Sequence, residues 1–163
     1  SVADLVIDSS TLNIHQLDKK VLEIFSEGKG ADLKVNILSF GYKYGIPVDA
    51  DLVMDCRFIP NPHWIPELRP LTGKDSAVSQ NVLNAENVQE FLNKYQELFH
   101  TISKGFISEG RKYLTLGVGC TGGKHRSVAI AEELAKRFDG TPHESGKKIS
   151  AVAIHRDLGK ENS

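Results

Sequence analysis

The stretch YLTLGVGCTGGKHRSVAIAEELAKRF, residues 113–138, decides the fold class. Its apolar start predicts a strand over residues 113–118, and the apolar spacing after its basic residues predicts a helix over 128–138. A glycine-rich segment joins the two. A strand, a glycine-rich loop and a helix in this order are typical of α/β folds, in which parallel strands alternate with helices.

The flanking sequence extends this alternation. Apolar runs predict strands over residues 33–40, 52–56 and 149–154, and helical spacing predicts a helix from Asn84 to Lys104 that Gly105 terminates. The proline-rich segment 58–70 can form neither a helix nor an inner strand. The sequence therefore predicts an α/β three-layer sandwich with a mostly parallel sheet and a phosphate-binding strand–loop–helix. A further strand (4–7) and helix (14–25) precede this unit, and a chain that starts on a strand suggests a piece of a longer protein.

Length and composition narrow the function classes. The chain has 163 residues, of which 40% are hydrophobic and 25% charged, as in one folded domain. The formal charge of −1 argues against a globally cationic nucleic-acid binder. No apolar run approaches the roughly 20 residues that span a bilayer, and no signal peptide is expected. Cys56 and Cys120 are interpreted as reduced cytosolic thiols, and no histidine or cysteine pair has metal-ligand spacing.

The loop 117–127 (GVGCTGGKHRS) is the first candidate site. Its glycines allow successive backbone N–H groups to face one concavity, and the following helix adds the positive end of its dipole. Lys124, His125 and Arg126 add donors, and a guanidinium can bind phosphate through two parallel hydrogen bonds. These features predict a bound phosphate group; the alternative is a purely structural turn.

The type of phosphate chemistry is less constrained. The Walker A pattern fails, because Gly123 stands where a register from Gly117 requires lysine. The Cys120-x5-Arg126 spacing, with a serine after the arginine, matches the loop of cysteine phosphatases, in which a thiolate attacks phosphorus. Gly119 replaces the histidine that usually precedes that nucleophile. Cys120 is thus either a nucleophile or a small buried residue.

A second polar group favours a sugar phosphate as the ligand. Asp55 and Arg57 lie at the end of a predicted strand, and Asn61 and His63 follow in the proline-rich segment. Loops at the carboxyl ends of parallel strands are where open α/β sheets bind ligands. The alternative is that Asp55 and Arg57 pair with their neighbours and that His63 caps a turn.

Five segments carry a family resemblance: FGYKYGIP (40–47), DADLVMDCRF (49–58), PNPHW (60–64), LRPLTG (68–73) and GCTGGKHRSV (119–128). Over residues 33–157 the chain resembles the carboxyl-terminal domain of the RapZ/YvcJ proteins. Residues 2–25 resemble the last strand and helix of that family's amino-terminal P-loop domain. The resemblance thus divides the chain into a remnant of that domain, 1–30, and a carboxyl-terminal domain, 31–163.

The resemblance implies a bacterial cytosolic regulator rather than a metabolic enzyme. It implies a domain that senses glucosamine 6-phosphate, binds a small RNA, presents that RNA to a ribonuclease and assembles into homo-oligomers. ATP or GTP would bind only to the amino-terminal P-loop domain, so that no cofactor is expected in this chain. The implied sugar-phosphate contacts are Asp55, Arg57, Asn61, His63, Thr121, Gly122, Gly123, Lys124, His125 and Arg126.

RNA binding would need a surface of aromatic and basic side chains, because bases stack on aromatic rings and cations reach phosphates. The alternative is an ordinary solvated surface. The tail after Asp157, LGKENS, is less basic than the resemblance leads one to expect. The candidates are Tyr42, Lys43, Tyr44, Lys74, Arg111, Lys112, Arg156 and Lys160.

Overall fold

The computed structural model describes residues 33–142, 146 and 148–160. The predicted strand 4–7, the predicted helix 14–25 and the domain division at residue 30 lie outside them. The described elements are, in order, β1 (Leu33–Gly41), η2 (Tyr42–Tyr44), β2 (Leu52–Asp55), η3 (Pro62–Trp64), α2 (Ser76–Leu83), α3 (Val88–Ser108), β3 (Tyr113–Cys120), α4 (Arg126–Phe138) and β4 (Ile149–His155).

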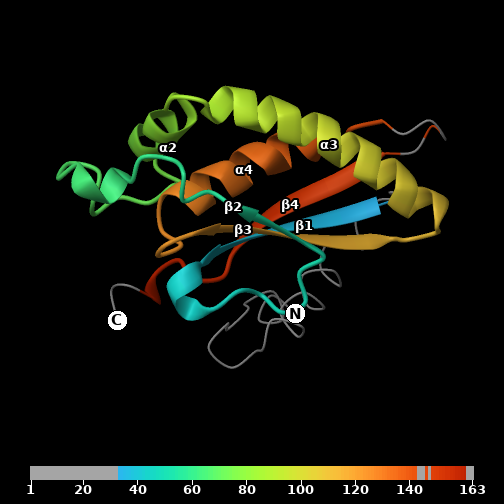
Figure 1. Cartoon of the computed structure of the whole chain (residues 1–163), viewed down its shortest axis with the longest axis horizontal. Coiled ribbons are helices and arrows are strands. Elements are labelled where there is room, and N and C mark those ends of the chain that lie inside the picture. The colour runs from blue at the N-terminus through green and yellow to red at the C-terminus, as the bar shows by residue number, and fades with distance from the viewer. Residues whose placement is uncertain (1–32, 143–145, 147, 161–163) are drawn as a thin grey trace, which may run out of the picture.

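The four strands form one sheet in the order β2-β3-β1-β4, and every pair is parallel. The β2-to-β3 and β3-to-β4 connections cross the sheet in the same direction, so that right-handed crossovers place α2, α3 and α4 on one face (Figure 1). The β1-to-β2 connection runs the opposite way and crosses the other face. Within the described residues, the predicted sandwich thus consists of helices, a parallel sheet and this connection.

The core lies between the sheet and the helices. β1 is flanked by β3 and β4. Eight of its nine residues are buried, namely Leu33 and the run from Val35 to Gly41, so that both faces of the strand are covered. This burial explains why its sequence is nearly continuously apolar rather than alternating. Val35 and Ile37 join Ile130 and Leu134 of α4 in the main apolar cluster. The carboxyl ends of β1, β2 and β3 consequently meet at one edge, beside the first turn of α4.

The elements predicted within the described residues are present, but their ends differ. The helix predicted over 84–104 is α3, 88–108, and a separate helix, α2, precedes it. Asn87, with φ of +69°, breaks the chain between the two. Gly105 does not end α3: the chain turns at Gly110, which has φ of +83° and donates its amide to the carbonyl oxygen of Ile107. β3 extends to Cys120, and α4 begins at Arg126, two residues before the predicted start.

Gly105 is an exposed residue inside α3, and no atom lies within 4 Å of the position that a Cβ would take there, so that Gly105→Ala is expected to stabilise the protein. Glycine in a helix costs about 0.5–1 kcal/mol relative to alanine. A urea denaturation midpoint that rises by the corresponding amount would check this. A variant less stable than wild type would contradict the placement of Gly105 within the helix.

None of the helices in the described part of the chain has the length and the apolar character needed to cross a membrane.

Candidate functional site

The loop between β3 and α4, residues 121–125, lies directly against the end of β1. A Cβ atom on Gly41 would lie 2.5 Å from the carbonyl carbon of Gly122, and one on Gly123 would lie 2.7 Å from the amide nitrogen of Gly41. Gly123 also has φ of +75°, a conformation that side chains disfavour. Both glycines are therefore required by main-chain contact, and they fix the loop on the edge of the sheet. We call residues 120–126 the phosphate loop, after the ligand that the sequence predicts for them.

The main chain of the phosphate loop presents hydrogen-bond donors. The amide of Gly123 donates to the sulfur of Cys120 at 3.3 Å. Four further amides donate to no acceptor within the part of the chain that the structure describes: those of Thr121, Gly122, Lys124 and Arg126. Because α4 begins at Arg126, these amides lie at the positive end of its dipole. Such an arrangement attracts an anion.

Arg126 connects the phosphate loop to the segment that follows β2. Its side chain is buried, and Nη1 donates to the carbonyl oxygens of Arg57 at 3.1 Å and Ile59 at 2.9 Å. Nη2 donates to the hydroxyl of Thr121 at 3.3 Å. Nε is buried and has no partner among the described residues. A buried donor without a partner costs free energy.

The phosphate loop forms one wall of a cavity of about 300 Å³. The other walls come from η2 and the proline-rich segment. Of the described residues that line it, none is acidic and three carry a positive charge, so that the cavity favours an anion electrostatically. The lining residues are Lys43, Asn61, His63, Trp64, Cys120, Thr121, Gly122, Lys124, His125 and Arg126.

The proline-rich segment shapes the mouth of this cavity. Asn61 caps the 3-10 helix η3, because its Oδ1 accepts the amide of His63 at 3.1 Å. The rings of His63 and Trp64 meet edge to face at 5.3 Å, and Trp64 is 74% exposed. His125 is buried and lies with Nε2 3.2 Å from the carbonyl oxygen of Arg69. Lys43 and Trp64 line the cavity and are not among the predicted sugar-phosphate residues. For Trp64, its aromatic side chain directly after His63 is the one sequence feature that could have indicated a place in the site.

Asp55 and Arg57 lie outside the lining of this cavity and bind each other. The Arg57 guanidinium donates to both carboxylate oxygens of Asp55 at 2.7–3.1 Å. These hydrogen bonds lower the pKa of Asp55. Arg57 also stacks on Tyr42, with Cζ 3.8 Å from the ring centroid. This is the pairing with neighbours that the sequence leaves open as the alternative. Gly123 is likewise outside the lining, and it lies against the main chain of Gly41 instead.

Cys120 is the last residue of β3 and is buried. Its Sγ lies 3.1 Å from the hydroxyl of Ser127, in addition to the contact with the Gly123 amide. The sulfur thus faces the concavity of the phosphate loop. Among the described residues, no three histidine, cysteine, aspartate or glutamate side chains are grouped so that they could hold a metal ion.

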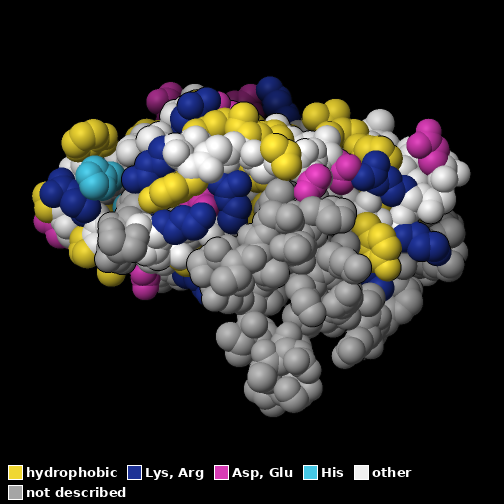
Figure 2. Space-filling view, turned by 90° about the horizontal axis from the view of Figure 1, so that it is seen from below, with side chains coloured by type: hydrophobic (Ala, Val, Ile, Leu, Met, Phe, Trp, Pro, Cys, Tyr) yellow, Lys and Arg dark blue, Asp and Glu magenta, His cyan; other side chains and the backbone are white. Residues whose placement is uncertain are grey.

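The predicted RNA-binding residues divide into two groups. Tyr42, Lys43 and Tyr44 form η2, and Lys43 Nζ and Lys160 Nζ each lie 5.1 Å from the Tyr44 ring centroid. Arg156 lies over Phe40 at 5.6 Å, on the same side of the sheet. We call Tyr42, Lys43, Tyr44, Arg156 and Lys160 the aromatic–basic surface. In Figure 2, Lys and Arg side chains lie among hydrophobic ones in the left half of the molecule, which is the half that contains η2 in Figure 1.

The remaining candidates lie elsewhere. Arg111 and Lys112 precede β3, at the opposite end of the sheet from the phosphate loop, and Arg111 pairs with Asp51. Lys74 lines a separate hollow together with Glu132 and Lys136. The structure therefore does not bring these three cations to the aromatic–basic surface.

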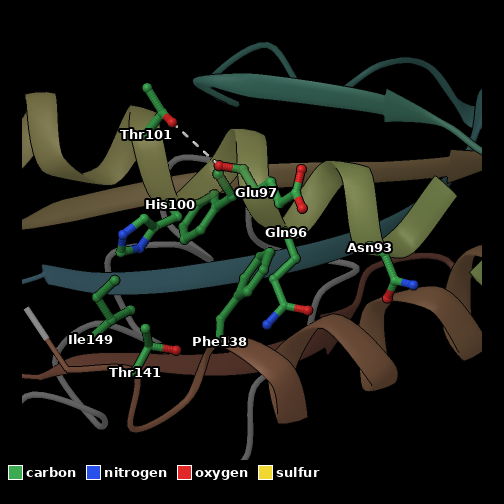
Figure 3. A pocket seen from close by; sticks show the side chains of 9 residues that line it. Asn93, Gln96, Glu97, His100, Thr101, Phe138, Thr141 and Ile149 are labelled. Carbon is green, nitrogen blue, oxygen red and sulfur yellow. Dashed lines mark hydrogen bonds between the residues drawn. The ribbon is translucent and has the colours of Figure 1, made fainter. Parts of the chain in front are cut away.

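A larger cavity, of about 720 Å³, lies between α3 and the end of α4 (Figure 3). Phe99 and Phe138 stack at its base, with ring centroids 4.0 Å apart. Figure 3 shows the side chains of Gln96 and Phe138 facing the space between the two helices. Among the described residues, no lysine or arginine lines this cavity. Those residues therefore offer no cationic donor to a phosphate ligand.

A hydrogen-bonded chain for which the sequence carries no local signal joins β1, β4 and α4. His155 Nδ1 lies 2.6 Å from the hydroxyl of Ser39, and its Nε2 lies 2.8 Å from Oε1 of Glu132. Because a carboxylate only accepts, Nε2–H donates to Glu132 and the Ser39 hydroxyl donates to Nδ1. Ser39 is fully buried, so that these hydrogen bonds connect β1, β4 and α4 rather than presenting a nucleophile.

His155 should make stability depend on pH. Burial lowers its pKa, and the hydrogen bond to Glu132 offsets only part of that effect. As the pH falls below the ordinary histidine value of about 6.5, the unfolded chain takes up a proton before the folded one, and the free energy of unfolding decreases. We expect His155→Gln to lose less stability than wild type between pH 7.5 and pH 5.5 in urea denaturation. Equal losses would contradict this assignment.

Comparison with known proteins places these features in a family. The family described as the RapZ C-terminal domain matches residues 33–159. The chain belongs to this family. The match includes every residue that lines the cavity at the phosphate loop.

Relatives of this RapZ C-terminal domain carry the name "nucleotide-binding protein". One from Acidothermus cellulolyticus is 54% identical over 98% of the chain and 51% of its own length. Others, from Streptomyces griseus and Thermobifida fusca, are each 52% identical over 98% of the chain. The match covers 46% of the length of the first and 52% of the length of the second. The chain therefore spans about half the length of the curated relatives that it matches.

Proposed function

We propose that this RapZ C-terminal domain binds a phosphorylated amino sugar of the glucosamine 6-phosphate type and acts as a regulatory sensor of it. The observation that carries the proposal is the cavity at the phosphate loop. It combines main-chain amides without an acceptor among the described residues, the guanidinium of Arg126 and, among the described residues, a lining without carboxylates. The family resemblance supplies the identity of the sugar.

In the proposed complex, the phosphate group occupies the concavity of the phosphate loop and accepts from its amides and from Arg126. Lys43 and Lys124 contribute charge from the rim. The sugar ring extends toward η3, where Trp64 offers an aromatic face and His63 offers ring nitrogens for hydroxyl groups. A cavity of about 300 Å³ is close to the lower limit for small-ligand sites, which suits a monosaccharide phosphate.

Calorimetric titration with a matched set of ligands tests this proposal. We expect binding of glucosamine 6-phosphate, weaker binding of glucose 6-phosphate and inorganic phosphate, and no binding of glucosamine. The phosphate supplies the charge-assisted hydrogen bonds, so that its removal should abolish the heat signal. Equal binding of glucosamine with and without its phosphate would contradict the proposal.

A second candidate function, RNA binding, is favoured by the aromatic–basic surface beside the cavity. Tyr44 is the test residue because two cations lie over its ring. If single-stranded RNA stacks there, Tyr44→Ala should weaken binding roughly 5- to 150-fold, since a stacked base contributes about 1–3 kcal/mol. The measurement is fluorescence anisotropy with a labelled oligonucleotide.

Two controls sharpen this test. Tyr113→Ala removes a 43% exposed tyrosine from the start of β3, at the opposite end of the sheet, and should not change RNA affinity. Wild-type affinity should also fall steeply between 50 mM and 200 mM salt, because phosphate contacts release counterions. A flat salt response, or equal losses in the two tyrosine variants, would argue against RNA binding at this surface.

An alternative function, a cysteine-dependent phosphatase, is favoured by one observation: Cys120 Sγ lies within 3.3 Å of the Gly123 amide at the start of a helix. Cys120→Ser separates the two functions. A phosphatase would lose all turnover of p-nitrophenyl phosphate in this variant. The sensor proposal expects no turnover in either protein and retained affinity for glucosamine 6-phosphate in the variant.

Other proposed properties rest on the resemblance alone. They are a cytoplasmic location, homo-oligomers and a ribonuclease partner to which RNA is presented.

A further inference from the structure

The two cysteines lie next to each other across neighbouring strands. Asp55 of β2 is paired with Gly119 of β3, so that one further step of this register sets Cys56 opposite Cys120. The amide of Cys56 donates to the carbonyl oxygen of Gly119 at 2.7 Å, which is the hydrogen bond that this step requires. Residues paired in a parallel sheet point to the same face. Met54 and Val118, two positions earlier, are both buried in the helix-facing core.

The spacing of paired strands suits a disulfide. Neighbouring strands are about 4.8 Å apart, and the Cα atoms of disulfides are roughly 4.4–6.8 Å apart. Burial raises the pKa of the Cys56 thiol, and the nearness of Cys120 raises it further. Both thiols are free in this structure.

The two cysteines differ in access. Cys120 lines the cavity at the phosphate loop, whereas Cys56 does not and is fully buried. The Cys120 sulfur accepts the Gly123 amide at 3.3 Å and lies 3.1 Å from the Ser127 hydroxyl. A small oxidant that enters the cavity therefore meets Cys120 first, and Cys56 is placed to react with the product.

We propose that Cys56 and Cys120 form a reversible disulfide that closes the phosphate loop to its ligand. Hydrogen peroxide oxidises the Cys120 thiol to a sulfenic acid and is reduced to water. The Cys56 sulfur then attacks the sulfenic sulfur: the S–S bond forms, the S–O bond breaks, and the oxygen leaves as water with the Cys56 proton. In total, two electrons and two protons pass from the thiols to the peroxide.

The disulfide would act on the site through two contacts. Sγ of Cys120 would turn toward β2, so that the Gly123 amide loses its acceptor. Cys56 also precedes Arg57, whose carbonyl oxygen accepts from Arg126 Nη1, so that movement of Cys56 disturbs the Arg126 side chain. The effect on affinity rests on the proposed function, whereas formation of the disulfide does not.

Mass spectrometry after mild peroxide treatment tests the bond itself. In wild type we expect a mass loss of about 2 Da and a linked peptide pair that contains Cys56 and Cys120. Neither cysteine should then react with an alkylating reagent, and a dithiol reductant should reverse all of these changes. In Cys56→Ala the sulfenic acid on Cys120 should instead be trapped by dimedone. Two outcomes would overturn the proposal: oxygen adducts on the cysteines without a bond between Cys56 and Cys120, or disulfides that form only between chains.

Calorimetry with glucosamine 6-phosphate on the same samples tests the consequence. Oxidised wild type should bind at least about tenfold more weakly than reduced wild type and recover on reduction. Cys120→Ser, which cannot form the bond, should bind equally before and after peroxide. A disulfide that forms without changing affinity would overturn the regulatory effect. If reduced protein does not bind the sugar phosphate at all, the proposed function fails while the mass measurement still decides on the disulfide.

Discussion

Gly123→Ala is expected to destabilise the protein by about 2–5 kcal/mol and to abolish binding at the phosphate loop. The φ of +75° costs a residue with a Cβ about 1–2 kcal/mol. In addition, the new Cβ would lie 2.7 Å from the Gly41 amide nitrogen and 3.0 Å from the carbonyl carbon of Phe40, which must move apart. Overpacking of this kind costs about 1–3 kcal/mol. Urea denaturation gives the free energy of unfolding directly.

Gly110→Ala is the matched control for this variant. Gly110 has a similar φ of +83°, but no atom lies within 4 Å of the position of its Cβ. It should therefore show only the conformational cost, and the difference between the two variants measures the contact of the phosphate loop with β1. Equal destabilisation of Gly110→Ala and Gly123→Ala would mean that the loop does not pack on the end of β1 as described.

Arg126→Ala is expected to weaken binding of glucosamine 6-phosphate about 10- to 150-fold. A hydrogen bond to a charged group contributes roughly 1.5–3 kcal/mol, and the substitution removes the guanidinium that carries the buried Nε. The variant should also be less stable, because the carbonyl oxygens of Arg57 and Ile59 lose their donor. Calorimetry measures the affinity, and denaturation confirms that the variant is folded at the temperature used.

Two further variants separate charge from geometry. Arg126→Lys keeps the positive charge but lacks the planar fork of donors with which a guanidinium binds phosphate through two parallel hydrogen bonds, so that an intermediate affinity is expected. Lys112→Ala removes one positive charge from an exposed position at the opposite end of the sheet, and its affinity should equal that of wild type. If Lys112→Ala weakens binding as much as Arg126→Ala, the ligand responds to net charge and not to this site.

The strand–loop–helix formed by β3, the loop after it and α4 could be predicted because its signals are local. Apolar residues before and after a glycine-rich, basic segment define it within one stretch, 113–138. The predicted start of α4 is two residues late because apolar periodicity begins only at Val128, while the first turn is polar. The sequence does not predict α2, which is eight residues long and whose apolar pattern reduces to two buried residues, Val78 and Val82.

Contacts between distant segments could not be predicted from the sequence. Nothing local in the sequence indicates that Arg126 donates to carbonyl oxygens 67 and 69 positions away. The same holds for His155, which meets Ser39 across 116 positions. Asp55 and Arg57, by contrast, are two positions apart, and the sequence alone could not decide whether they bind a ligand or each other. The register of β2 on β3 settles both this edge of the site and the nearness of the two cysteines.

Amide chemical shifts in a nitrogen-15-labelled sample test the central claim most directly. Titration with glucosamine 6-phosphate should shift the amide signals of Thr121, Gly122, Lys124 and Arg126 most strongly, because these donors would acquire a charged acceptor. Signals from the larger cavity, such as those of Gln96 and His100, should stay in place. Saturable shifts confined to the cavity between α3 and α4, with the phosphate loop unaffected, would contradict the account.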